Sequence, residues 1–370
     1  MTHRNLQRTP GPRKQSGSLT VEEGLFPRLP RLIRSLVRGE RVFLITDSNV
    51  RRILGAKVHR SFVLAGIDIV LVEIPPGEMS KSQKILSSIQ NQLLLHGINR
   101  RSLILALGGG VVGDIAGFAA ATVLRGVRYV HVPTSLLAQV DSSIGGKVGI
   151  NHRIGKNLIG AFHQPTGIFT DPALLHTLPV AEFRNGLAEV VKIAFACDPA
   201  FFQWLEKNTA KIRKANRTIL KRLVKRSASL KLSIVQRDER DEGIRKILNF
   251  GHSIGHALEV ASGYTISHGS AVAMGMVVEA GIAVEMGLLK KSDFSRLVRL
   301  LGLFGLPTEF PPLKKKSIFL TALSLDKKNS TGAQRFALPR GIGKMVPDVK
   351  IQGIDLESMI FRKPNPKSLF

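Results

Sequence analysis

Cysteine is nearly absent from this sequence: its 370 residues contain a single cysteine, Cys197. A disulfide within the chain is therefore excluded, and the composition is typical of a reducing compartment, so we expect a cytoplasmic protein. Cys197 lies on the apolar side of a helical pattern. This position favours a buried, inert thiol over a nucleophile.

Long uncharged apolar segments are also missing. Glu279 and Glu285 interrupt the most apolar stretch, so no segment reaches the roughly 18 residues that a membrane-spanning helix needs. We therefore expect a soluble protein with no membrane partner.

Acidic residues are few, with 27 Asp and Glu against 54 Lys and Arg, which gives a net charge of +27. Such an excess attracts nucleic acid nonspecifically through phosphate contacts. The cations are spread over segments such as RLIRSLVRGER, KRLVKRSASLK and LKKKS, without a recognised nucleic-acid motif. We therefore expect no specific nucleic-acid partner. A nonenzymatic nucleic-acid-binding role remains an alternative, which would require tight binding at high salt.

The order of strand-like and helix-like segments predicts two domains, and 370 residues exceed the size that one core usually serves. Up to about residue 183, apolar runs such as VFLIT, IVLVEI, LILAL and YVHVP alternate with helical stretches, which is typical of a Rossmann-like parallel sheet with crossover helices. After residue 183, nearly all of the sequence has helical periodicity. The predicted fold is therefore a disordered basic tail (1–20), an α/β domain (21–183) and an all-α domain (184–370), with the active site in the cleft between the two domains.

A glycine-rich turn stands out in the first domain, in LILALGGGVVGDIAGFAA at residues 103–120. An apolar strand leads into Gly108, Gly109 and Gly110, and a helix of small residues follows. Backbone N–H groups at such a helix start can meet a phosphate. The run does not match G-x-G-x-x-G, so a purely structural tight turn is at least as consistent with it.

Histidines are concentrated in NFGHSIGHALEVASGYTISHG. If RKILNFGHSIGHALE is one helix, Arg245, Asn249, His252, His256 and Glu259 recur at intervals of four, three, four and three and share one face. The polar face of a surface helix would normally carry Lys, Glu and Gln instead. The histidines therefore predict a site.

A carboxylate completes a candidate metal site. Glu189, in GLAEVVK, could join His252 and His268, because neutral imidazole and carboxylate together suit Zn²⁺ and related ions, and a catalytic site keeps one position open after three protein ligands. Each histidine alone would more often be an ordinary hydrogen-bonded side chain. Their clustering beside the glycine-rich turn favours the metal.

Five segments together resemble 3-dehydroquinate synthase: GGGVVGD, LRGVRYVHVPTSLLAQVDSSIGGK, GKNLIGAF, GLAEVVK and NFGHSIGHALE. They follow one another in the family order between about residues 40 and 345. The resemblance implies an NAD- and metal-dependent phosphate lyase of the shikimate pathway, which leads to chorismate and the aromatic amino acids. Its substrate is 3-deoxy-D-arabino-heptulosonate 7-phosphate and its products are 3-dehydroquinate and phosphate.

The reaction that the resemblance implies passes through a transient oxidation. NAD oxidises a substrate hydroxyl to a ketone, which acidifies the neighbouring proton so that phosphate leaves by β-elimination. The NADH then reduces the ketone, the ring opens, and an aldol reaction closes the carbocycle. NAD is thus regenerated in each turnover.

The resemblance also implies site residues. The metal ligands, for Zn²⁺ or Co²⁺, fall on Glu189, His252 and His268. The substrate-binding and catalytic positions fall on Asp141, Lys147, Asn157, Lys192, Lys231, Arg245, Asn249 and His256. Arg125 and Arg245 are predicted to clamp phosphate oxygens through forked hydrogen bonds. His256, Lys192 and Asp141 are expected to tune proton movement.

The implied NAD-binding positions lie mostly after predicted strands: Asp47, Asn49, Glu78, Lys81, Gly109, Gly110, Val111, Asp114, Thr134, Ser135, Lys147, Lys156, Thr177, Leu178 and Glu182. A carboxylate just past a strand can hold ribose hydroxyls. Asp47 could equally cap a helix. Asp326, Lys327 and Lys328 resemble a C-terminal family motif that brings a lysine to the substrate. The sequence does not decide which of the two lysines has this role.

Departures from the family pattern are small, with Ser135 where a threonine is frequent and Val148 after the glycine-glycine-lysine run. Related cyclases act on sedoheptulose 7-phosphate or glucose 6-phosphate, and the first is the main alternative. Asp141, Lys147 and Asn157 favour the dehydroquinate reaction. Metal-dependent alcohol dehydrogenases resemble the two-domain plan but would not need the lysine array. The family also implies a homodimer.

Overall fold

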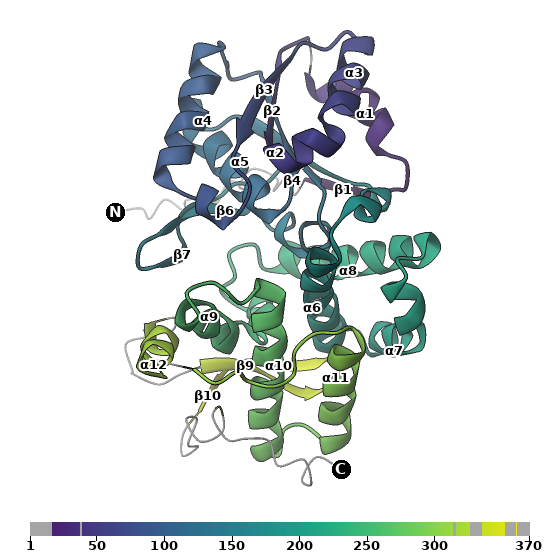
Figure 1. Ribbon diagram of the computed structural model, residues 1–370, viewed down its shortest axis with the longest axis vertical. Coiled ribbons are helices and arrows are strands. Elements are labelled where there is room, and N and C mark those ends of the chain that lie inside the picture. Colours follow the sequence, from purple (N-terminus) through teal and green to yellow (C-terminus); the bar gives the residue numbers. More distant parts are fainter. Residues whose placement is uncertain (1–16, 38, 314–315, 326–334, 352–359, 361–370) are drawn as a thin grey trace, which may run out of the picture.

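Two domains lie one above the other in the computed structural model, which describes residues 17–37, 39–313, 316–325, 335–351 and 360 (Figure 1). A parallel sheet with helices forms the upper domain, and a mostly helical domain with yellow-green C-terminal elements forms the lower one (Figure 1). The predicted fold class is therefore confirmed in its two main parts.

Six strands form the sheet, in the order β1-β8-β5-β4-β2-β3, and every neighbouring pair is parallel. Their bounds are β1 (Ser18–Val21), β2 (Val42–Asp47), β3 (Ile69–Ile74), β4 (Leu103–Gly108), β5 (Arg128–Pro133) and β8 (Gly167–Thr170). The central strands read as continuous apolar runs because both of their faces are buried.

Helices cover both faces of this sheet. On one face, α1 (Leu29–Val37) and α3 (Ala56–Leu64) pack with alternate strand residues such as Leu44 and Leu105. On the other face, α4 (Gln83–Leu95) and α5 (Gly110–Thr122) pack with Ile45 and Ala106. The odd and even positions of β2 and β4 thus belong to two different cores.

The strand order reverses direction between β2 and β4, since β2 continues to β3 on one side and β4 continues to β5 on the other. In open parallel sheets, the crevice at the carboxyl ends of two such strands is where ligands bind. Asp47 ends β2, and Gly109 follows β4. The topology therefore predicts a binding site at these residues.

Shorter elements connect the sheet. A hairpin of β6 (Lys147–His152) and β7 (Gly155–Phe162) extends from the sheet domain toward the helical domain (Figure 1). The remaining short helices of this domain are η1 (Phe26–Arg28), α2 (Ser48–Val50), η2 (Arg51–Gly55), η3 (Glu78–Ser80), η4 (Val123–Arg125), η5 (Ala138–Ser142) and η6 (Pro172–Thr177).

The helical domain encloses the largest apolar cluster, to which α6, α9 and α10 contribute most of their buried side chains. Its helices are α6 (Val180–Cys197), α7 (Pro199–Arg213), α8 (Arg217–Arg237), η7 (Ile244–Asn249), α9 (His252–Ala261), α10 (His268–Glu285), α11 (Lys291–Leu303) and α12 (Lys316–Leu325). Among the described residues, no helix combines the length and the hydropathy needed to cross a membrane.

Four sequence expectations differ from the structure. The helical domain also contains an antiparallel hairpin, β9 (Arg335–Gly341) with β10 (Lys344–Lys350), so it is not all-α. Residues 18–20, assigned to a disordered tail, lie in β1, because they pair with β8. The expected boundary after residue 183 falls inside α6. The fourth concerns RKILNFGHSIGHALE, which is not one helix.

A glycine separates that segment into two helices. The 3-10 helix η7 ends at Asn249, and α9 begins at His252 after Gly251, whose φ of 80° lies in the left-handed region. A Cβ at Gly251 would lie 2.7 Å from the carbonyl oxygen of Val272, so close packing against α10 also requires glycine. Glu279 of α10 accepts a hydrogen bond of 2.7 Å from the Gly251 N–H, which anchors the start of α9.

Candidate active site

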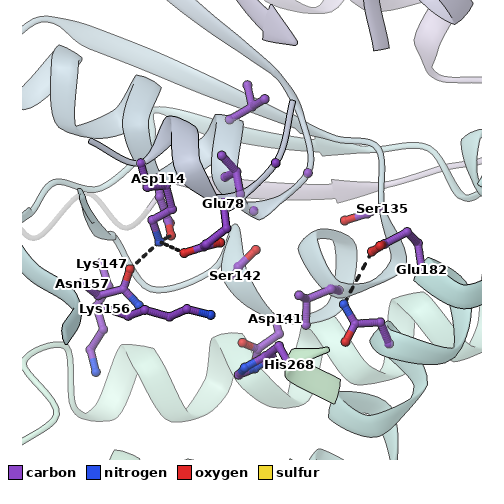
Figure 2. Close-up of a pocket in the computed structure, with 18 of the residues that line it drawn as sticks. Glu78, Asp114, Ser135, Asp141, Ser142, Lys147, Lys156, Asn157, Glu182 and His268 are labelled. Carbon is purple, nitrogen blue, oxygen red and sulfur yellow. Dashed lines mark hydrogen bonds and ion pairs between the residues drawn. The ribbon is translucent and has the colours of Figure 1, made fainter. Parts of the chain in front are cut away.

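A cavity of about 1500 Å³ lies between the two domains. It extends from the carboxyl ends of β2 and β4 to the start of α9 and α10. This volume exceeds that of a typical pocket for one small molecule, so it can hold more than one ligand. Figure 2 shows acidic and cationic side chains converging on it from both domains.

The sheet edge of the cavity is built from strand ends. Asp47 lines it and also caps α2, because its carboxylate accepts a 2.9 Å hydrogen bond from the Val50 N–H, so the helix-cap interpretation is confirmed. Gly109 precedes α5 as an N-cap without a side-chain hydrogen bond, which leaves the start of α5 suited to an anion. A Cβ at Gly110 would lie 3.0 Å from the Ser142 hydroxyl, so the small residue keeps this end open.

A polar cluster connects the sheet domain with the hairpin tip. The Lys81 ammonium lies 2.7 Å from Asp114 Oδ2 and also donates to the Asn157 side chain (Figure 2). Asn157 has φ of 56°, in the left-handed region that asparagine adopts more readily than most other non-glycine residues. Burial raises the pKa of Asp114, although Lys81 opposes this effect.

Asp141 lies between two buried lysines. Its Oδ1 is 2.7 Å from Lys231 Nζ and 3.9 Å from Lys192 Nζ. Burial lowers the pKa of Lys231, and Asp141 opposes this effect. For Lys192, burial also disfavours the charged form, but the Glu189 and Asp141 carboxylates outweigh it and raise the pKa. The pairing keeps positive charge inside the cavity.

Arg245 is oriented by main-chain carbonyls. Its guanidinium donates to the Gly145 oxygen at 3.2 and 3.3 Å and to the Glu239 oxygen at 2.6 Å. Gly145 has φ of 115°, and a Cβ there would lie 2.2 Å from Arg245 Nη2. Beside this group, Lys147 of the hairpin forms an ion pair with Asp241. The two cations form one end of the cavity.

The predicted metal ligands converge where the helical domain borders the cavity. The Nε2 atoms of His252 and His268 lie 3.5 and 3.3 Å from Glu189 Oε1, and one donor atom from each of the three residues falls within 4.8 Å of the others. Both Glu189 carboxylate oxygens are buried, and neither meets a donor with hydrogen-bond geometry, although Lys192 lies against Oε2. A buried carboxylate in this situation, facing two imidazoles, fits a divalent cation.

The electrostatics of this triad agree with that fit. Burial would raise the pKa of Glu189, but Lys192 and the two histidines hold it well below the usual range. Burial and Lys192 hold the pKa of His252 well below its usual range, so its imidazole is neutral. Burial also acts on His268, but the Glu189 and Glu259 carboxylates outweigh it and raise the pKa to about 9. To act as a metal ligand through Nε2, His268 would have to give up a proton.

The structure brings nearly all the predicted site residues to this cavity. Those that line it are Asp47, Asn49, Glu78, Lys81, Gly109, Gly110, Val111, Asp114, Thr134, Ser135, Asp141, Lys147, Lys156, Asn157, Thr177, Leu178, Glu182, Lys192, Lys231, Arg245, Asn249, His252, His256 and His268. Glu189 lies directly behind two of them. Asp326, Lys327 and Lys328 fall outside the described residues.

Arg125 is the exception, because it is exposed and does not line the cavity. It ends η4 just before β5 begins, with φ of 63°, whereas the cavity lies where β5 ends. The expected phosphate clamp by Arg125 and Arg245 is therefore not formed within a single chain.

Two acidic partners were absent from the sequence-derived site. Asp241, which pairs with Lys147, lies in RDERDEG, where its proximity to Arg245 in the sequence was the available signal. Glu259 was placed on the histidine-bearing face but was given no role. It lies 3.4 Å from His268 Nδ1 and 2.8 Å from Lys156 Nζ.

Cys197 ends α6 and takes no part in the cavity. Burial raises the pKa of its thiol to about 12. The side chain is only half-buried, so the expectation of a buried thiol is met in part, while the raised pKa favours the expected inertness.

Comparison with known sequences gives one consistent result. Residues 71–185 and 186–329 match the family models described as 3-dehydroquinate synthase N-terminal and 3-dehydroquinate synthase C-terminal. The 3-dehydroquinate synthase of Desulforamulus reducens is 46% identical over 90% of this chain and 92% of its own. That of Pelobacter propionicus is 46% identical over 90% of this chain and 93% of its own.

Solved structures with the same fold include other cyclases. The 2-epi-5-epi-valiolone synthase ValA of Streptomyces hygroscopicus, with NAD⁺ and Zn²⁺ bound, is 28% identical, with a TM-score of 0.87 over 96% of this chain and 98% of its own. A 2-deoxy-scyllo-inosose synthase complexed with carbaglucose-6-phosphate, NAD⁺ and Co²⁺ is 26% identical, with a TM-score of 0.83 over 92% and 95%. An iron-containing alcohol dehydrogenase is 15% identical, with a TM-score of 0.68 over 93% and 95%, and shares only the fold.

Proposed function

Because the chain belongs to the 3-dehydroquinate synthase family, we propose that its cavity binds NAD at the sheet edge, one divalent metal at Glu189, His252 and His268, and the substrate between them. Its activity is that of the family, the conversion of 3-deoxy-D-arabino-heptulosonate 7-phosphate to 3-dehydroquinate and phosphate. The observation that supports the residue assignments is the convergence of a buried carboxylate, two histidines and a cationic end in one cavity.

The two cofactors supply different chemistry when bound. Bound NAD would take up the hydride from the substrate carbon that carries a hydroxyl, while that hydroxyl loses a proton, and would return the hydride in the same turnover. The metal supplies a Lewis acid that polarises a substrate oxygen. Asp47 at the end of β2 and Glu182 in the first turn of α6 both line the cavity and are suited to hold ribose hydroxyls, while the start of α5 is suited to the pyrophosphate.

The phosphate of the substrate is proposed to lie against Arg245 and Lys147. The guanidinium has five N–H donors, and main-chain carbonyls already fix its plane, so little freedom is lost when the remaining donors meet an anion. Lys147 adds a cation from the other domain. Together they stabilise the negative charge that develops as the phosphate departs.

The sugar-acid part is proposed to lie between Asp141 and the histidines. Lys231 and Lys192 both lie near Oδ1 of Asp141, at 2.7 and 3.9 Å, and restrict the orientation of its carboxylate. A carboxylate fixed in this way can accept a proton from a bound hydroxyl and return it, while the two ammonium groups hold anionic oxygen atoms in place. His256 and Asn249 line the same region and orient the substrate.

The test is phosphate release by the purified protein with NAD. We expect release from 3-deoxy-D-arabino-heptulosonate 7-phosphate that a chelator abolishes and Zn²⁺ or Co²⁺ restores. Sedoheptulose 7-phosphate is the control substrate, and release from it alone would reassign the chain to a neighbouring activity. Release that is insensitive to the chelator would contradict the metal assignment.

We also propose that the chain acts as a homodimer in the cytoplasm. The family resemblance supports the dimer, and the single cysteine supports a reducing compartment. Light scattering coupled to size-exclusion chromatography measures the molar mass of the protein in solution. A mass equal to that of one chain would contradict the homodimer.

A further inference from the structure

Glu259 is a buried carboxylate whose position the proposed reaction does not use. It lies on α9, one helical turn after His256, and only 2% of its surface is exposed. Burying a charge is costly unless that charge is paired. Both of its oxygens are paired, with Oε2 3.4 Å from His268 Nδ1 and Oε1 2.8 Å from Lys156 Nζ. Glu259 therefore connects a proposed metal ligand with a lysine.

Glu259 could itself be a ligand, because its carboxylate, His256 and His268 each place a donor atom within 4.8 Å of the others. The surroundings argue against this alternative. The Lys156 ammonium lies against one Glu259 oxygen and His268 against the other. Glu189 also has an ammonium, Lys192, against Oε2, but its Oε1 faces the Nε2 atoms of two histidines at 3.5 and 3.3 Å, and neither oxygen meets a donor in hydrogen-bond geometry. A cation is better accommodated at Glu189.

We propose that Glu259 is a positioning residue for His268, and that Lys156 holds Glu259 in place. Accepting a hydrogen bond from Nδ1 fixes the tautomer in which Nε2, the atom that faces Glu189, carries the lone pair for a metal. The same contact sets the plane of the imidazole ring. This inference rests on the metal site proposed above.

Lys156 reaches Glu259 from the other domain. It lies on β7, its ammonium is 4.6 Å from the centroid of the Tyr264 ring, and it points into the cavity (Figure 2). The next residue, Asn157, accepts a hydrogen bond from Lys81, which pairs with Asp114. One hairpin tip therefore contacts both the NAD side of the cavity and the orienting carboxylate of a metal ligand. The orientation of His268 depends on a segment more than a hundred residues away in the sequence.

The experiment measures metal affinity by competition with a chelator, in the full chain without substrate. We expect Glu259→Gln to weaken Zn²⁺ binding by about 10- to 100-fold, as removal of an orienting partner does at other metal sites. Lys156→Met should give a smaller loss, since Glu259 remains but is held less firmly. The matched controls are Glu206→Gln and Lys246→Met, which break ion pairs outside the cavity. Both controls should bind Zn²⁺ like the unaltered protein.

The visible absorption spectrum of bound Co²⁺ shows whether Glu259 positions His268 or is itself a metal ligand. The Co²⁺-loaded Glu259→Gln variant should keep the visible absorption intensity of the unaltered protein, because the three ligands are still present. A change to the spectrum of a lower-coordinate or six-coordinate ion would make Glu259 a ligand and overturn the inference. Thermal unfolding in excess chelator should remain cooperative for Glu259→Gln, with a midpoint below that of Glu206→Gln, because this variant removes the partner of Lys156 and His268. A non-cooperative transition for Glu259→Gln alone would reduce its role to packing.

His268→Ala distinguishes this inference from the proposed function. If His268→Ala loses the metal while Glu259→Gln binds it with unaltered affinity, the orienting role is wrong and the ligand assignment stands. If His268→Ala itself keeps full affinity, the ligand assignment fails, and the inference fails with it.

Discussion

Replacing Asp141 with asparagine tests how the cavity holds two buried lysines. The change keeps the shape of the side chain but removes the negative charge that lies 2.7 Å from Lys231 Nζ and 3.9 Å from Lys192 Nζ. Lys192 retains Glu189, and Lys231 retains a 2.8 Å hydrogen bond to the main-chain oxygen of residue 141. Lys231 is therefore the group left without a counterion.

The magnitude follows from the burial of that lysine. Removing one partner of a buried ion pair costs about 3–5 kcal/mol. Asp141 is partly exposed and Lys231 keeps one acceptor, so we expect the lower end, a loss of about 3 kcal/mol in the free energy of unfolding at neutral pH. Denaturant unfolding followed by circular dichroism measures it.

The loss should depend on pH in one direction. Burial already lowers the pKa of Lys231, and removing Asp141 lowers it further. Between that pKa and the ordinary lysine value, the unfolded chain binds a proton that the folded chain does not, so the stability of Asp141→Asn rises with pH. The deficit relative to the unaltered protein should therefore shrink as pH rises above neutrality.

A double variant supplies the control. Asp141→Asn with Lys231→Met removes both charges, so most of the lost stability should return while turnover stays low, because both residues line the cavity. A deficit of less than about 1 kcal/mol in the single variant, or no recovery in the double variant, would refute the argument that the pair compensates a buried charge.

Three further predictions concern Gly145, His131 and Cys197. Gly145→Ala would place a Cβ 2.2 Å from Arg245 Nη2 and displace the guanidinium. KM for the phosphorylated substrate should therefore rise about tenfold, which corresponds to a loss of roughly 1.4 kcal/mol in binding free energy, while the metal content stays unchanged. An unaltered KM would contradict the role of Arg245. Burial lowers the pKa of His131 from 6.5 to about 4, so between these pH values the unfolded chain binds a proton at His131 and the folded chain does not. The free energy of unfolding, measured with urea, should therefore fall by about 2 kcal/mol between pH 7 and pH 5. His131→Asn should remove that part of the pH dependence, and identical slopes in both proteins would contradict it. Cys197 is half-buried and its thiol pKa is raised to about 12, so a thiol reagent at pH 8 should modify it far more slowly in the folded protein than after unfolding, and equal rates would contradict the raised pKa.

Local sequence patterns determined much of this protein. The apolar strands and the glycine turn after β4 each depend on residues within a few positions of one another, so their conformation follows from short-range rules. The metal-ligand residue types could also be identified in the sequence, although Glu189 lies far from His252 and His268 along the chain and only the fold brings the three together. Even Asp47 as a helix cap could be anticipated, because its hydrogen bond goes to Val50, three residues later.

Tertiary packing decided the rest. The left-handed Gly251 divides the predicted histidine helix because the close approach of α10 leaves no space for a Cβ. The fold places Arg125 away from the cavity, because it precedes β5 instead of following it. Pairs such as Lys147 with Asp241, and Lys156 with Glu259, join residues about a hundred positions apart. Their meeting depends on how the two domains pack, since no local preference acts over such a separation in the sequence.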